Sequence, residues 1–180
     1  MPAHGWCLFD TPIGACAIAW RAQAIAGVLL PEDRPAQTGP RFQQRLPDAV
    51  PGPAPDWVQA VIGRIQRLLE GAAEDLGDVP LDLTGVPEFN QRVYAVARAI
   101  APGQTLSYGE VATRLGDPGA ARAVGQALGH NPFAPIVPCH RVLAAGKRSG
   151  GFSAGGGVAT KLRMLQIERA QLGDGPGLFD

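Results

Sequence analysis

The spacing of the hydrophobic residues changes along this chain of 180 residues, and that change limits the folds it can adopt. Near the N-terminus apolar side chains alternate, as Cys16, Ile18 and Trp20 do, and a period of two is typical of strands. From Trp57 onwards they recur every three or four residues, which is typical of helices. The sequence therefore predicts an α+β fold, with a small antiparallel sheet followed by helices.

Turn signals and spacing place the elements of the N-terminal part. TPIG at 11–14 predicts a hairpin turn, and the apolar run 24–30 predicts another strand. Residues 31–55 are rich in proline and show neither period, which predicts an irregular connector. A helical stripe over 57–69 predicts a helix, and LDL at 81–83 suits a short last strand.

A boundary is expected near the turn signal TGVP, because the charge balance changes sign just after it. Residues 1–90 hold six basic and eleven acidic residues, whereas 91–180 hold ten basic and five acidic ones. The predicted units are a sheet-plus-helix domain at 1–84, a helical domain at 85–172 and a tail at 173–180.

The basic second half favours a polyanionic partner such as nucleic acid, although a solvated basic face explains the charge equally well. Between Arg92 and Arg169 stand ten bases and three acids. No apolar run is long enough to span a membrane, and the first residues lack the features of a signal peptide. Three cysteines are too few for a disulfide framework, so we expect a cytoplasmic protein with reduced thiols.

Two short helical patterns, over 108–115 and about 120–128, are joined by the tight turn GDPG and predict a helix-turn-helix. The second pattern, ARAVGQALG, has Arg122 as its one charged residue among small side chains. Small side chains allow close approach to DNA, but they cannot read base edges in the major groove.

The tetrapeptide PCHR places Cys139 beside His140 within the basic half. A thiol becomes a nucleophile when a neighbouring group favours its ionisation, and histidine is such a group. Neighbouring side chains in extended backbone diverge, so the two can cooperate directly only in a bent segment, or through water. From this motif alone, a buried cysteine beside a structural histidine is an equal alternative.

A second set of soft ligands, His4, Cys7 and Cys16, matches no compact zinc pattern. We expect no metal there, and small apolar packing for the two cysteines.

The C-terminal half resembles the O6-alkylguanine-DNA alkyltransferases, a family of single-use DNA-repair proteins. The resemblance covers about residues 86–170 and rests on NPFAPIVPCHRVL, with SYGEVA and ARAVG upstream; Asn131 stands eight positions, and Arg122 seventeen, before Cys139. It implies a ribonuclease H-like N-terminal domain and a winged-helix-like domain carrying the helix-turn-helix. It also implies irreversible transfer of an alkyl group from O6-alkylguanine, and from O4-alkylthymine, to Cys139, without a cofactor.

The same resemblance assigns roles at the reaction centre. Cys139 would accept the alkyl group, His140 would take the thiol proton through a water, and Glu168 would polarise His140. Asn131 would brace the turn that carries the cysteine.

Other residues would bind the DNA and the extruded base. Arg122 would fill the gap in the base stack, while Ala121, Ala123 and Gly125 let their helix lie in the minor groove. Tyr108 would bind the DNA by helping to turn the 3′ phosphate, and would donate a proton toward guanine N3 as the base leaves. Substrate contacts are implied for Tyr108, Val142, Phe152, Ser153 and Lys161. Many members carry tyrosine at the position of Phe152, so this chain lacks that hydroxyl.

We expect a monomer that acts on double-stranded DNA without a membrane. A non-catalytic alkyltransferase-like sensor of lesions is the main alternative, and Cys139 counts against it because that group typically replaces the cysteine. The third alternative is a cysteine hydrolase that uses Cys139 and His140, and such an enzyme would release its product and react repeatedly.

Overall fold

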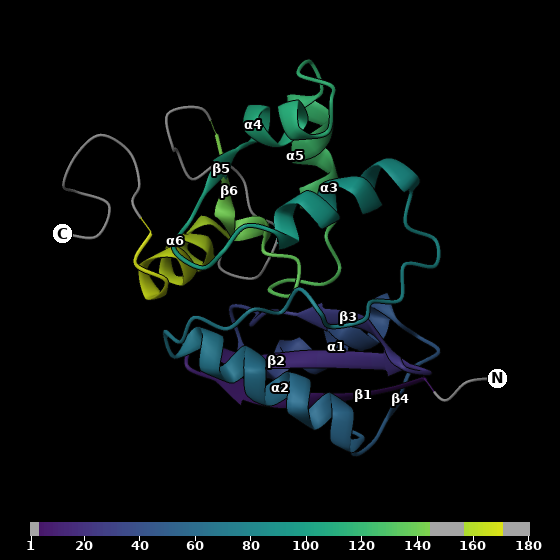
Figure 1. Cartoon of the computed structure of the whole chain (residues 1–180). Helices are drawn as coiled ribbons and strands as arrows, with labels where there is room; N and C mark the ends of the chain where they lie inside the picture. Colours follow the sequence, from purple (N-terminus) through teal and green to yellow (C-terminus); the bar gives the residue numbers. More distant parts are fainter. Residues whose placement is uncertain (1–3, 145–156, 171–180) are drawn as a thin grey trace.

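A computed structural model describes residues 4–144 and 157–170. Three strands, β1 (His4–Thr11), β2 (Gly14–Arg21) and β3 (Ala24–Leu29), pair antiparallel in chain order (Figure 1). Thr11 pairs with Gly14, so the predicted hairpin is confirmed. The mixed α+β fold with an N-terminal sheet is confirmed as well.

The two faces of this sheet pack against different helices. Cys16, Ile18 and Trp20 share one core with α2 (Asp56–Leu69), the helix predicted for this region. On the opposite face, Ala17 and Ala19 belong to a second cluster with Trp6 and Phe42. Alternation along β2 is therefore real, but both of its faces are buried.

The irregular connector predicted for residues 31–55 is wrong. It contains a helix, α1 (Pro35–Arg45), and a short strand, β4 (Val50–Pro51), which pairs parallel to β1 at the sheet edge. Phe42 of α1 is 1% exposed and meets the Trp6 ring edge-on, with the centroids 5.9 Å apart. Tertiary packing on the sheet thus outweighs the low helix propensity of a segment with two prolines and a glycine.

The strand expected at 81–83 is also wrong, since Leu81 forms only an isolated bridge with Ile25. No helix within the described residues is both long and apolar enough to cross a membrane.

The C-terminal part gathers above the sheet in Figure 1 and consists mainly of helices. A two-stranded parallel ladder joins β5 to β6, and α4 with α5 forms the predicted helix-turn-helix. Ser107 and Glu110 form a reciprocal capping box that starts α4. The elements are α3 (Glu88–Arg98), β5 (Leu106–Ser107), α4 (Tyr108–Arg114), α5 (Ala121–Gly129), a 3₁₀ turn η1 (Cys139–Arg141), β6 (Val142–Leu143) and α6 (Gly157–Ile167).

Direct hydrogen bonds join the sheet to the helices. The backbone N–H of Val28 in β3 donates to the carbonyl of Pro132 at 2.9 Å, and Arg163 of α6 donates to the carbonyl of Pro12 at 2.7 Å. The expected boundary falls in the connection between α2 and α3, and the division into two domains stays a prediction.

Candidate active site

Cys139 opens the 3₁₀ turn η1, directly after Pro138. This is the bent segment that cooperation between Cys139 and His140 requires. The turn is buried: Cys139 is 7% exposed and His140 is 1% exposed. Side chains of consecutive residues are therefore held in one enclosed region rather than on opposite sides of a strand.

Asn131 makes two side-chain hydrogen bonds to the segment that leads into this turn. Its amide Nδ2 donates to the Val137 carbonyl at 2.8 Å, and its Oδ1 accepts from the Phe133 N–H at 2.9 Å. Because the next residue, Pro132, is bound by β3, the N-terminal sheet supports the same bend. The residues around Asn131 thus connect the sheet to the turn that carries the cysteine.

Glu168 follows α6 and reaches back to His140. Its Oε1 lies 2.5 Å from His140 Nε2, and the two side chains are 1% and 3% exposed. Burial lowers the pKa of His140, so the imidazole is neutral and its Nε2–H donates to Glu168. The other ring nitrogen, Nδ1, is buried and has no hydrogen-bond partner among the described residues.

Arg141 is the functional neighbour that the sequence reasoning missed. Its Nε donates to both carboxylate oxygens of Glu168 at 2.9 Å, and its Nη1 donates to the Ile100 carbonyl at 2.6 Å. The available signal was a basic residue beside His140 in a segment with only three acids. Although burial alone would raise it, His140 and this arginine lower the pKa of Glu168 to about 2.

Lys161 supplies a second buried cation near the thiol. It is 1% exposed, and its Nζ donates to the Val142 carbonyl at 2.9 Å. Burial lowers its pKa to about 8. Burial raises the pKa of the Cys139 thiol, while the Asn131 side chain and the charge of Lys161 lower it. The thiol therefore keeps its proton at rest and needs a base to release it.

Tyr108 connects this centre to the helix-turn-helix. Lys161 Nζ lies 5.8 Å from the centre of its ring, and the ring lies beside Gly125 of α5. Burial raises the pKa of Tyr108, which keeps the phenol protonated. Arg122 is exposed near the start of α5, flanked by half-buried Ala121 and Ala123.

Two expected substrate contacts, Phe152 and Ser153, lie outside the described residues. Of the zinc candidates, His4 Nδ1 lies 3.2 Å from an Arg21 nitrogen and Cys16 is fully buried in the sheet core. Within residues 4–144 and 157–170, no cluster of three or more metal-ligating side chains occurs.

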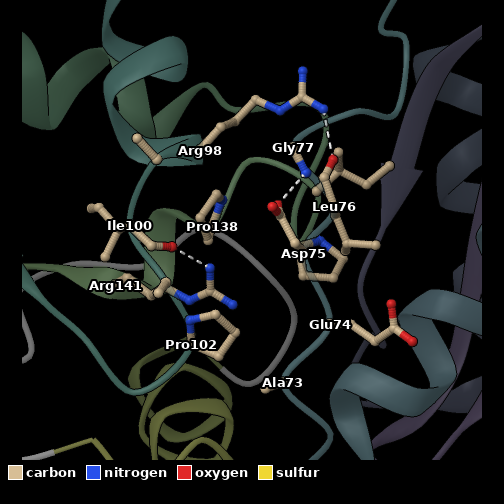
Figure 2. Close-up of a pocket in the computed structure, with 14 residues that line it drawn as sticks. Ala73, Glu74, Asp75, Leu76, Gly77, Arg98, Ile100, Pro102, Pro138 and Arg141 are labelled. Carbon is tan, nitrogen blue, oxygen red and sulfur yellow. Dashed lines mark hydrogen bonds between the residues drawn. The ribbon is translucent and has the colours of Figure 1, made fainter.

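A cavity of about 310 Å³ lies next to the turn η1 that carries Cys139 (Figure 2). Its walls come from the segment 73–77, from the end of α3 and from Pro138 and Arg141 of the turn. Arg141 borders this cavity, whereas Cys139, His140 and Glu168 do not line it.

The Glu168 cluster predicts a dependence of stability on acid. The pKa of Glu168 in the folded protein is about 2, below the ordinary 4.5. Its contribution to the free energy of unfolding is therefore complete above pH 4.5 and is lost as the pH falls toward 2. We expect Glu168→Gln to lower the free energy of unfolding at neutral pH by about 3–5 kcal/mol, because the Arg141 cation loses its partner. Chemical denaturation at several pH values measures both effects, and an acid dependence as steep in the variant as in the wild type contradicts them.

Comparisons with known proteins show which family this chain is similar to. The sequence pattern of the family described as 6-O-methylguanine DNA methyltransferase, DNA binding domain, matches residues 88–170. The methylated-DNA–protein-cysteine methyltransferase of Mycolicibacterium paratuberculosis is 36% identical, over 95% of this chain and 96% of the relative. That of Haemophilus influenzae is 31% identical, over 94% and 88%. The crystal structure of Mycobacterium tuberculosis OGT in complex with DNA superposes with a TM-score of 0.74 at 34% identity, covering 98% of this chain and 99% of the other.

Proposed function

Because the chain belongs to the family of methylated-DNA–protein-cysteine methyltransferases, we propose that it repairs DNA by moving an alkyl group from O6-alkylguanine to Cys139. The observation that carries this proposal is the buried sequence of groups from Glu168 through His140 to the thiol. A carboxylate that orients an imidazole beside a nucleophile is the arrangement that activates nucleophilic side chains.

The first step is removal of the thiol proton. With Nε2–H donated to Glu168, the lone pair of His140 lies on Nδ1, and this nitrogen accepts the Cys139 proton through a bridging water. The charge of Lys161 favours the thiolate that results. Because burial opposes ionisation of the thiol, the thiolate forms only when these groups act together.

The second step is displacement at the alkyl carbon. The Cys139 sulfur donates an electron pair to that carbon, the carbon–O6 bond breaks, and its electrons pass to the guanine, which takes up a proton. That proton comes from the phenol of Tyr108, which burial keeps protonated at rest, and the proton that His140 took from Cys139 balances it. The thioether product is stable, so each molecule reacts once and needs no cofactor.

The target base is reached by flipping it out of the duplex. Arg122, exposed on α5, fills the gap in the stack, and the small Ala121, Ala123 and Gly125 allow α5 into the minor groove. In the pocket, the Val142 carbonyl accepts from the exocyclic amine of guanine. A carbonyl has two lone pairs, so it can do this while it accepts from Lys161.

The finer features of the fold belong to the same proposal. We assign a ribonuclease H-like N-terminal domain, because three antiparallel strands are followed by a helix and a strand parallel to the first. We assign a winged-helix-like second domain around α4 and α5. A monomer acting in the cytoplasm suits three cysteines that form no disulfide. We further propose that Phe152 and Ser153 contact the substrate and that O4-alkylthymine is a second substrate.

The proposal is tested by incubating the protein with a duplex that contains one O6-methylguanine and weighing the intact chain. We expect one methyl group per molecule, located on Cys139 by peptide mapping, with uptake that stops at one equivalent. Continued turnover indicates a hydrolase, and DNA binding without any adduct indicates a lesion sensor. Either result overturns the proposed function.

A further inference from the structure

Arg141 takes no part in the proton path described above, yet it holds Glu168 more extensively than His140 does. Nε reaches both carboxylate oxygens, and Nη2 lies 2.9 Å from Oε1, the oxygen that also meets His140 Nε2. A further bond to the Ile100 carbonyl fixes the guanidinium to the end of α3. The arginine therefore determines where the carboxylate stands relative to the imidazole.

The charges of this cluster decide which proton state is favourable. When His140 is neutral, the positive charge of Arg141 cancels the negative charge of Glu168. The buried cluster of these three side chains then has no net charge. Protonation of His140 would leave one uncompensated positive charge. Without the arginine the preferred protonation state reverses. A neutral His140 would then leave the negative charge of Glu168 uncompensated, whereas a protonated His140 would neutralise it. Since burial of net charge is costly, the cation opposes protonation of His140.

We propose that Arg141 is a positioning residue for alkyl transfer, which anchors Glu168 and keeps His140 a neutral base. This inference rests on the proposed function. In this state His140 donates through Nε2 and accepts at Nδ1; an imidazolium would carry a proton on both nitrogens and could not take one from Cys139. Besides Arg141 and Glu168, the ammonium of Lys161 acts on the imidazole and also disfavours its protonation, while the Cys139 thiol meets the backbone of His140.

Arg141→Met tests the inference, because methionine keeps an unbranched apolar stem and removes the charge. The guanidinium already borders the cavity of Figure 2, so the shortened side chain extends an existing space. We measure the single-turnover rate of transfer from free O6-benzylguanine as a function of pH. The acid limb of the profile is expected to move up by about two pH units, with a rate at neutral pH about tenfold lower that recovers in alkali.

Nitrogen-15 NMR of the imidazole gives a second readout that does not depend on activity. At neutral pH the wild type is expected to show His140 as the neutral tautomer protonated at Nε2, and Arg141→Met to show imidazolium. Arg141→Lys keeps a cation and should restore most of the wild-type pH profile. If methionine prevents folding, Arg141→Gln, which keeps a donor for Glu168 but no charge, carries the same expectation.

Arg98→Met is the matched control. Arg98 borders the same cavity and donates to the carbonyls of Leu76 and Val79, but it has no contact with Glu168 in the described structure. Its loss should lower stability and leave the pH profile unchanged. A uniform loss of rate in Arg141→Met at every pH, with His140 still neutral, overturns the inference. If the wild type accepts no alkyl group at all, the proposed function fails, while the NMR titration still decides the role of Arg141.

Discussion

Replacing Cys139 with alanine is expected to abolish alkyl uptake entirely, because neither Cys7 nor Cys16 stands in a comparable setting. Cys16 is fully buried in the sheet core, and burial raises its pKa to about 12. Cys7 is half-buried in β1, where burial also raises its pKa. Burial disfavours the thiolate of both, and neither lies in the described structure beside an imidazole that is held by a carboxylate.

Cys7→Ala is the control for this experiment, since it removes a thiol outside the site and should retain full uptake. Both variants are incubated with the methylated duplex and weighed as intact chains. DNA binding by Cys139→Ala should persist, because the residues proposed to contact DNA lie on α4 and α5 and are untouched. A methylated Cys139→Ala protein would show that another atom is the acceptor.

The strand and helix periods predicted the sheet and most helices because large apolar residues recur at a regular interval along one face of each element. These periods failed for α1. Its prolines and glycine have low helix propensity, and contacts with Trp6 and the sheet stabilise the helix. A local pattern carries no information about such contacts. The parallel strand β4 was missed for the same reason, since its two residues are both exposed and gain their structure from β1.

The site was predicted from a motif, and the structure supplies what a motif leaves out. Cys139, His140 and Asn131 are near one another in sequence, so their cooperation could be anticipated. Glu168 comes from beyond α6, and only the resemblance pointed to it. Arg141 was passed over because its role depends on the carboxylate that the fold brings to it, at 2.9 Å.

The hydrogen bond that links the sheet to the site, from Val28 of β3 to Pro132, also has no sequence signal. Backbone donors and acceptors are the same at every position except proline, so residue identity does not reveal which of them pair. The N-terminal sheet therefore acts on the reaction centre through a contact that only coordinates reveal.

Arg122→Ala is expected to separate repair of duplex DNA from reaction with the free base. Extruding a guanine costs a few kcal/mol, and the side chain that fills the gap stabilises the extruded state. If Arg122 stabilises the extruded state by about 2–3 kcal/mol, its removal slows transfer from a methylated duplex by about 30- to 150-fold. Free O6-benzylguanine needs no extrusion, so its rate should stay within about twofold.

Arg114→Ala is the matched control for charge. Arg114 is exposed in the last turn of α4, within the same helix-turn-helix, so its loss removes one positive charge without touching the gap in the stack. Single-turnover rates on both substrates are measured for each variant. A phosphate contact contributes only to binding, and at saturating protein Arg114→Ala should react with duplex at nearly the wild-type rate. Equal losses on duplex and free base in Arg122→Ala would instead place Arg122 in the chemistry of the pocket and refute its role in base extrusion.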